Sequence, residues 1–530
     1  MKKIYLFLTG LAAFVLVSSC NKLDVPVQSQ YVKSNFPTTT ADYTALLGTM
    51  YSNLSSNFGV SYWRMQELST DEAIIPARDG NFDDGGQYRQ LHYHTWTFDH
   101  PNVITIWQWG FSGINTCNRL LGVVNNANSS PSVKAAYTAE IRGMRALYYY
   151  FMMDLYGNVP IITSFPVNTP PPTQPRAKVF SFIESELLAI LPQLPNKTNN
   201  SATNTLQYGR PTRAMAFALL AKMYLNAGVY TGTNRFQDVV TMADSVQNNT
   251  NYSLDASYRS IFLPNNGPQI NETIFAIPYD QQIPGNQFTR FGFLAYLAPA
   301  YGLNASLSIA MSTTPEFYNR FNLPNDFRTN TWLTGPQYYP DGNGGFTNQP
   351  AYFQGTTTQI VITPQLVLVP GKPMDVGNTI ASQCEGIRSI KYYPDPAIIQ
   401  ATRLNGNDVP VLRLADVYLM KAEAILRGAT MTTVAGDLQT PLELVNKIRA
   451  RSGAQLATSI DLPGLLDERA RELSWEGWRR NDLIRYGLFE TSYPLPNDVL
   501  TMDTDPTRRL FPVPSTELKT NPNLVQNPGY

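Results

Sequence analysis

The stretch AAYTAEIRGMRALYYYFMMDLYG, residues 135–157, decides the fold class of this 530-residue chain. Side chains on one face of it recur every three to four residues, at Ala139, Arg142, Ala146, Tyr149 and Met153. This spacing is the period of an α-helix, and the glycine that ends the stretch is a common helix stop. The stretch therefore predicts a helix over residues 135–156.

The same helical period returns along the chain in consecutive pairs of segments. The pairs are 135–156 with 179–191, 211–224 with 236–247, and 412–427 with 441–450. Because one pair cannot bury its apolar face alone, such pairs are expected to stack as tetratricopeptide-like units. We therefore predict an all-α fold class with little strand, in which paired helices form a scaffold.

The composition excludes one class of partner. Charged residues make up 15% of the chain, and the 40 basic residues balance the 40 acidic ones without any basic run. An average protein has about 25% charged residues. A nucleic-acid partner therefore has no electrostatic footprint here. Aromatic residues reach 12%, which favours stacking and hydrogen bonding over charge steering.

The N-terminus predicts export and lipidation. Lys2 and Lys3 precede an apolar run over residues 4–17, which is short for a membrane span and typical of a secretory signal. The run ends in VSSC, residues 17–20, which resembles a bacterial lipobox. We predict a signal peptide over 1–19, lipidation at Cys20 and a polar tether over 20–40. The alternative is an ordinary signal peptide with a chance cysteine.

Cys117 and Cys384 are the other two cysteines, far apart and without a partner motif. One disulfide would be possible in an oxidising compartment, but Cys117 lies in a helical-looking segment. Lone cysteines are commonly buried apolar side chains, so free thiols are favoured.

Metal-binding motifs are weak. All three histidines, His92, His94 and His100, fall within nine residues, and two of them could bind zinc from one face of a strand. With only Asp99 as an acidic neighbour, ordinary loop or surface histidines are favoured. DGNG, residues 341–344, lacks the further oxygens of a calcium loop and is typical of a turn. No metal, cofactor or phosphate-binding glycine loop is predicted.

The stretch DERARELSWEGWRRNDLIR, residues 467–485, holds ten charged side chains. On a single helix, Arg469 would reach Glu472, Glu476 would reach Arg479 and Arg480, and Asp482 would reach Arg485. Gly477 would permit close helix packing. A hydrolase needs one carboxyl with a raised pKa, whereas basic neighbours favour the ionised form. The stretch therefore predicts structural ion pairs and no catalytic residue.

Several segments together resemble one known family. They are AEIRGMRALYYY (139–150), LYGNVP (155–160), NETIFA (271–276), RLADVYLMKAEA (413–424), NKIRAR (446–451), the charged stretch 467–485 and the closing QNPGY (526–530). Their order, with the lipobox, is similar to that of the SusD/RagB outer-membrane lipoproteins. The resemblance implies a SusD-like scaffold of tetratricopeptide-like helix pairs, exposed at the cell surface. It also implies a TonB-dependent, SusC-like transporter as partner, which imports captured glycan or peptide. The corresponding regions are 41–270 and 271–530.

The ligand-binding residues are expected in loops mounted on the helices. Residues 278–373 have few charges, no helical period and many aromatic side chains, which indicates a long loop-rich insertion. Sugar rings pack on aromatic planes, so such rings could form a glycan platform. For any one ring, core packing is the alternative, and Trp107 and Trp109 look most core-like. The candidate ligand residues are Trp96, Tyr296, Trp332, Trp63, Phe291 and Tyr301.

These observations predict a non-enzymatic outer-membrane lipoprotein that binds glycan and acts as a lid on a transporter. Capture of peptide or another nutrient is the alternative within the same class. Two further alternatives are a structural lid that has no ligand of its own and an extracellular glycosidase.

Overall fold

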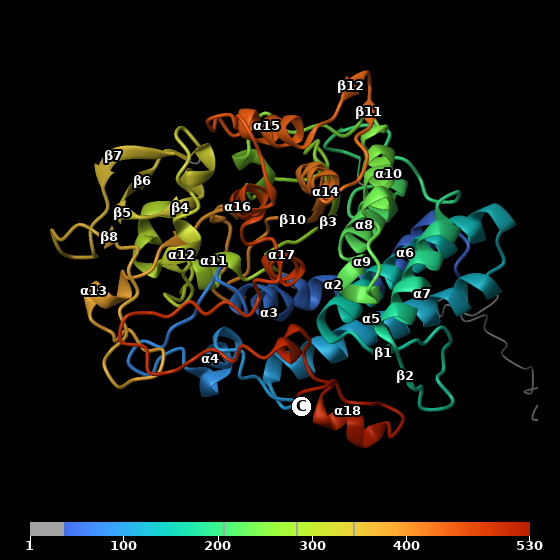
Figure 1. Cartoon of the computed structure of the whole chain (residues 1–530), viewed down its shortest axis with the longest axis horizontal. Coiled ribbons are helices and arrows are strands. Elements are labelled where there is room, and N and C mark those ends of the chain that lie inside the picture. Colours follow the sequence, from blue (N-terminus) through green and yellow to red (C-terminus); the bar gives the residue numbers. More distant parts are fainter. Residues whose placement is uncertain (1–35, 205–206, 282–284, 343–344) are drawn as a thin grey trace, which may run out of the picture.

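The computed structural model describes residues 36–204, 207–281, 285–342 and 345–530 (Figure 1). The predicted signal peptide, the lipidation site at Cys20 and most of the tether lie outside these residues. Within the described ranges, no helix combines the length and the apolar character that crossing a bilayer requires.

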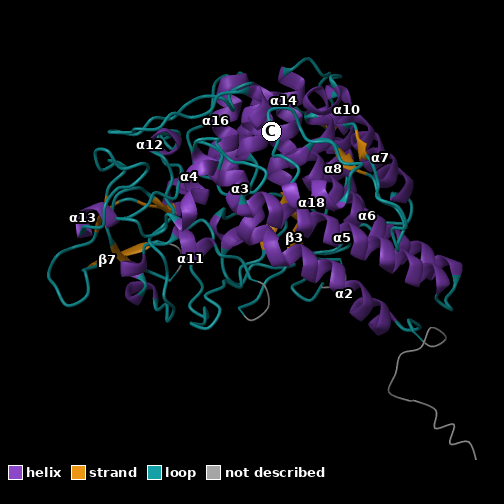
Figure 2. Cartoon of the chain, turned by 90° about the horizontal axis from the view of Figure 1, so that it is seen from below, coloured by secondary structure: helices purple, strands orange, loops and turns teal. Residues whose placement is uncertain are grey.

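The body of the molecule is helical, as predicted. Most of its long helices lie together, away from the loop-rich end of the molecule (Figure 2). They are α2 (Thr40–Asn57), α5 (Pro101–Asn126), α6 (Pro131–Tyr156), α7 (Arg176–Ile190), α8 (Arg213–Leu225), α10 (Phe236–Gln247), α14 (Leu414–Leu426), α15 (Pro441–Arg451) and α16 (Leu462–Leu473). The two helices of each predicted pair pack together: α6 with α7, α8 with α10, and α14 with α15. Caps support several of them: Thr440 and Glu443 form a capping box at the start of α15.

Shorter helices connect and flank these pairs. They are α3 (Trp63–Leu68), α4 (Gln87–His92), α9 (Ala227–Thr231), α11 (Phe288–Gly292), α12 (Pro315–Tyr318), α13 (Ile380–Gln383), α17 (Arg479–Tyr486) and α18 (Ser515–Thr520).

Strands are few and short, and the described ladders are two-stranded and antiparallel. They pair β1 (Val159–Pro160) with β2 (Thr173–Gln174), β3 (Thr273–Ile277) with β10 (Val409–Arg413), β4 (Trp332–Leu333) with β9 (Arg388–Ser389), β5 (Gly335–Pro336) with β8 (Val361–Ile362), β6 (Tyr338–Pro340) with β7 (Phe346–Pro350), and β11 (Thr433–Val434) with β12 (Asp437–Leu438). The β3–β10 ladder positions part of the buried ion-pair network described below, because it places Arg413 opposite Thr273, beside Glu272.

One large apolar core runs through both predicted regions of the chain. Trp63 of the N-terminal region packs edge-on against Phe288 and also contacts Trp475, both from the C-terminal region. The two regions therefore share their core, and the division at residue 270 remains a prediction about the sequence.

The loop-rich segment predicted over 278–373 is irregular, with short helices and hairpins. It builds a second, smaller core around Phe293, Leu297, Tyr301 and Phe353. The β6–β7 hairpin of this segment lies at the end of the molecule opposite α6 and α7 (Figure 1).

The charged stretch 467–485 is not the single helix that its pattern predicts. Helix α16 ends at Leu473, and α17 begins at Arg479. Between them, Trp475 and Gly477 take left-handed φ values of 59° and 80°. The break aims two backbone N–H groups at buried acids of the N-terminal region: Trp475 donates to Glu72, and Gly477 donates to Glu67 Oε1 at 2.7 Å. Gly477 therefore serves this turn, which glycine can form without strain, rather than helix packing.

The charges of the stretch do form structural ion pairs, but mostly with distant partners. Asp482 with Arg485, at 2.7 Å, is the one predicted pair that the structure contains. The other predicted pairings are wrong. The break separates Glu476 from the helical spacing of Arg479 and Arg480, and Arg469 and Glu472, although both on α16, each bind partners from other segments. Arg480 instead lies over the rings of Phe489 and Phe511. The observed partners are Asp416 and Asp482 for Arg469, Arg413 and Lys391 for Glu476, and Asp71 for Arg479.

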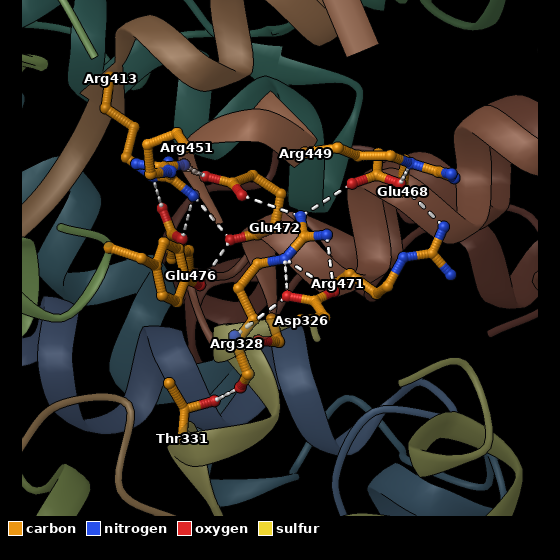
Figure 3. A network of polar contacts seen from close by, with 12 residues as sticks. Asp326, Arg328, Thr331, Arg413, Arg449, Arg451, Glu468, Arg471, Glu472 and Glu476 are labelled. Atoms are coloured by element: carbon orange, nitrogen blue, oxygen red, sulfur yellow. Dashed lines mark hydrogen bonds and ion pairs between the residues drawn. The ribbon is translucent and has the colours of Figure 1, made fainter. Parts of the chain in front are cut away.

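Glu472 lies at the centre of this buried network (Figure 3). Its carboxylate accepts hydrogen bonds from Arg413 at 2.6 Å, from Arg328 at 3.0 Å and from Arg451. Burial alone would raise the pKa of Glu472, yet Arg451, Arg413 and Arg328 hold it well below the usual range. The network is thus a fixed set of charges that joins α16 to β10, α15 and the segment around residue 328.

Glu67 and Glu72 form a second buried acidic group, in which the two carboxyls share a hydrogen bond. Burial raises the pKa of Glu67 to about 7, and burial together with the Glu67 charge raises that of Glu72 well above its usual value. Because both pKa values are higher in the folded protein than in the unfolded chain, this pair contributes full stability below about pH 4.5. That contribution declines as the pH rises through 7.

We expect Glu72→Gln to remove this pH dependence, since an amide can donate to Glu67 and accept from Trp475 without titrating. Relative to wild type, the variant should gain about 1–3 kcal/mol of unfolding free energy between pH 5 and pH 7.5. Urea unfolding followed by circular dichroism at the two pH values measures this difference. The exposed control Glu316→Gln should show none. Equal differences for both variants would show that the Glu67–Glu72 pair is not the source of this pH dependence.

Cys117 and Cys384 are free and buried, as predicted. The histidines differ from the prediction, because all three are buried rather than at the surface. His94 Nε2 and His100 Nε2 lie 2.9 Å from the carbonyl oxygens of Ser69 and Gln87, which explains their burial. Among the described residues, no group of histidine, cysteine and acidic side chains could hold a metal ion.

Candidate functional site

Five of the six predicted ligand rings lie in the core. Trp96 is 1% exposed; its Nε1 donates to the Tyr530 hydroxyl, and its ring packs on Phe511. Trp332 packs edge-on against Phe321 and Trp475. Neither ring presents a face to a ligand, so we revise their interpretation to core packing, the alternative considered for each ring.

The remaining predicted rings differ in exposure. Trp63 and Tyr301 are buried, Tyr301 against Phe293. Phe291 is 9% exposed and lies beside Arg64. Tyr296 is half-buried, and its hydroxyl donates to Gln383. Trp107 and Trp109 are buried, as expected of core residues. Sequence alone does not separate ligand-binding rings from core rings, because the large apolar area of an aromatic side chain drives its burial wherever the fold permits it.

Exposed rings gather instead on the β6–β7 hairpin of the loop-rich segment. Side chains alternate between the faces of a strand. Along β7 and the residues after it, Ala351 and Phe353 point into the second core, whereas Phe346 is 40% and Tyr352 48% exposed. Tyr338, on β6, is half-buried and pairs with Pro350. We call Tyr338, Phe346 and Tyr352 the hairpin rings.

The hairpin is held by its own turn and by its inner face. The Gly345 N–H donates to Asp341 Oδ1 at 3.0 Å, and the Asp341 N–H donates to the Gly345 carbonyl at 3.1 Å. Tyr339 packs on the second core from the inner face. The turn predicted over residues 341–344 lies partly outside the described ranges, because these omit residues 343 and 344.

The strand residues next to Phe346 are polar and uncharged. Thr347, Asn348 and Gln349 follow Phe346, and all three are exposed. Their hydroxyl and amide groups can hydrogen-bond the hydroxyls of a sugar while a ring packs against its C–H face. The sequence carries a signal for this site: a glycine-rich turn between two tyrosines and a phenylalanine, YYPDGNGGF, is typical of a hairpin.

A separate pocket of about 440 Å³ lies between α2, α6 and the segment around Tyr208. Its two charged side chains are already paired with each other: Glu140 accepts from Arg210 Nε at 2.8 Å, and also from the Tyr51 hydroxyl. What it offers a ligand is mostly apolar wall, which suits a sugar poorly. We therefore place the candidate ligand site at the hairpin rings.

The fold and the hairpin define the class: a mostly helical scaffold of tetratricopeptide-like pairs that displays an aromatic surface on a loop-rich insertion. Two family models match the chain, one described as "SusD family" over residues 271–530 and one as "Starch-binding associating with outer membrane" over residues 23–225. The chain belongs to the SusD/RagB family of outer-membrane-associated proteins.

Curated relatives extend over most of the chain. This chain is 26% identical to the starch-binding protein SusD of Bacteroides thetaiotaomicron, over 74% of its own length and 72% of that protein. It is 23% identical to the SusD-like protein P2 of Formosa agariphila, over 99% of both. The first of these relatives is named a starch-binding protein, in agreement with the predicted non-enzymatic class.

Solved structures share the fold. A SusD homologue from Bacteroides thetaiotaomicron matches with a TM-score of 0.73 at 18% identity, over 94% of this chain and 98% of that one. Surface glycan-binding protein A from the same organism, solved with laminarihexaose, matches with a TM-score of 0.70 at 19% identity, over 92% and 100%. The mostly helical, SusD-like architecture is therefore confirmed.

Proposed function

We propose that this protein captures glycan chains at the outer membrane through the hairpin rings and passes them to a TonB-dependent, SusC-like transporter. The observation that carries the proposal is the exposure of Phe346 and Tyr352 beside uncharged amides. Two comparisons support it: one relative is named a starch-binding protein, and one structural neighbour was solved with laminarihexaose. Lipidation at Cys20 would keep the protein at the membrane, next to the transporter.

The alternatives predict different behaviour of the purified protein. A peptide-capturing protein would bind peptides and no polysaccharide. A structural lid would bind neither, and a glycosidase would release reducing ends. The glycan is favoured because flat rings with neighbouring amides suit pyranose faces better than extended peptide backbone.

Affinity electrophoresis in gels containing starch or laminarin tests the proposal. We expect the wild-type protein to be retarded, and the double variant Phe346→Ala/Tyr352→Ala to bind at least tenfold more weakly. Loss of one stacked ring costs about 1 kcal/mol, so two rings give that change or more. Both side chains are exposed, so the unfolding transition should not move.

The matched control is Phe98→Ala. Phe98 has the same exposed fraction as Phe346, 40%, but is distant from the hairpin in the sequence. This control should bind like the wild type. Retention of binding in the double variant would overturn the assignment of the site. Release of reducing ends from the gel polysaccharides would overturn the non-enzymatic function.

A further inference from the structure

A cavity of about 340 Å³ lies between α5, β1 and the C-terminal segment that includes α18. On the α5 side, Trp107, Phe111 and Asn115 line it in one row, and Gln108 and Ser112 line it in the next. Residues four apart lie on one face of a helix, so the two rows form a continuous wall. The volume falls within the usual range of small-molecule sites, about 300–1,000 Å³.

The opposite wall is held in place by hydrogen bonds. Asn521 Nδ2 donates to the Pro171 carbonyl at 2.9 Å, which ties the C-terminal segment to the loop before β2. The Ile162 carbonyl accepts from Asn118 Nδ2 and from the Tyr149 hydroxyl, both at 3.0 Å. Asn521, Pro171 and Ile162 all line the cavity. The cavity is therefore built into the fold.

The polar side chains of this cavity have unused hydrogen-bonding capacity. Among the described residues, Ser112 and Asn115 make no side-chain hydrogen bond, and Asn115 Oδ1 is buried without a partner. Gln108 Nε2 reaches Glu517 only at 3.5 Å, beyond the usual N–H···O range. Polar groups that are shielded from water without a partner are unfavourable. These groups therefore favour a ligand that brings donors and acceptors.

The lining carries a single charge. Glu517 is the only charged side chain among the described residues that line the cavity, and it forms no ion pair within the described ranges. An anionic ligand would meet this carboxylate without a cation to offset the repulsion. An uncharged ligand would meet one hydroxyl, three amides and one carboxylate, set in apolar wall. The pocket beside α2 differs, because its charged side chains neutralise each other.

We propose that this cavity is a second glycan site, which takes a short uncharged oligosaccharide. Hydroxyl and amide groups both donate and accept, as the hydroxyls of a sugar do, and a carboxylate accepts from them. The apolar wall around Trp107 and Phe111 suits the C–H faces of the sugar. Helix α18 lies well away from the β6–β7 hairpin in Figure 1 and in Figure 2. The inference thus goes beyond the site proposed above and does not depend on the hairpin rings.

The test uses the full-length protein with the hairpin rings removed by Phe346→Ala/Tyr352→Ala. Titration calorimetry measures the binding of neutral oligosaccharides of glucose, mannose, galactose or xylose, and of oligogalacturonate as the acidic arm. We expect at least one neutral oligosaccharide to bind this variant. Oligogalacturonate should bind at least tenfold more weakly than that oligosaccharide, because of the Glu517 charge.

Two changes in the cavity are then added to this background. Ser112→Ala/Asn115→Ala should weaken binding about tenfold, because two hydrogen bonds to the ligand are lost. The melting temperature should not fall, since neither side chain bonds to the protein and alanine favours a helix. Ser112→Phe should abolish binding, because its ring fills the cavity. The control Ser181→Phe adds the same ring at an exposed serine of α7 and should leave binding within twofold.

The outcomes keep the two proposals apart. If the hairpin variant binds no oligosaccharide, or if Ser112→Phe leaves that binding unchanged, the second site is overturned. Equal affinity for oligogalacturonate would overturn its uncharged ligand class. Binding of a tetrapeptide in place of every sugar, lost in Ser112→Phe, would also overturn the proposal, in favour of a peptide site. Glycan capture by the hairpin rings is decided separately, by the retardation of the wild-type protein in polysaccharide gels.

Discussion

Glu472→Gln is expected to lower the free energy of unfolding by about 3–5 kcal/mol, the usual cost of breaking a buried ion pair by removing one partner. The amide fills the same volume but leaves Arg328, Arg413 and Arg451 without the carboxylate they share. Arginine cannot release its proton to relieve the repulsion. The loss should appear in urea unfolding at neutral pH.

The control lies on the same helix. Asp467 pairs with Arg320 at 3.1 Å, but its side chain is 48% exposed, so water screens the pair. Asp467→Asn should cost less than about 1 kcal/mol. Similar losses for the two variants would show that the network does not act as a buried unit. The difference in unfolding free energy between wild type and Glu472→Gln should also shrink as the pH falls below about 4.5. Glu472 is then protonated in the unfolded chain, so the stabilisation that comes from its lowered pKa in the folded protein is progressively lost.

Gly113→Ala should be a damaging single-methyl change on α5. A Cβ at this position would lie 2.3 Å from the Tyr148 ring of α6. That ring cannot move aside, because its hydroxyl donates to the Met50 carbonyl at 2.8 Å and accepts from Asn53 at 3.0 Å. Overpacking of this kind costs about 1–3 kcal/mol, and the melting temperature should fall accordingly.

The same helix provides the opposite result. Gly122 faces solvent, and nothing lies within 4 Å of a Cβ built there. Gly122→Ala should therefore raise stability by about 0.5–1 kcal/mol, because alanine is the better helix former. If both variants shifted the melting temperature in the same direction, helix propensity rather than close packing would govern α5.

The helices could be predicted because their signal is local. In 135–157 the apolar period, the stop at Gly157 and the length all lie within one segment, and α6 runs to Tyr156. The ion pairs could not be assigned in the same way. Arg479 binds Asp71, which is 408 residues away, and no local spacing encodes such a partner.

The ligand site was predictable only in part. The loop-rich segment was recognised by its composition, but the choice of rings within it requires knowing which strand face the second core covers. Tyr338 was visible as part of an aromatic run, whereas Tyr352 is distinguished from Phe353 only by alternation against that core.

The turn between α16 and α17 has a consequence for biosynthesis. Glu67, Asp71 and Glu72 leave the ribosome about 400 residues before Trp475, Gly477 and Arg479, the groups that satisfy them. Until those groups are synthesised, burial of these acids in their ionised form would lack its partners, so we expect this part of the nascent chain to close late. Such delayed closure would suit export of the unfolded chain, which the predicted signal peptide implies.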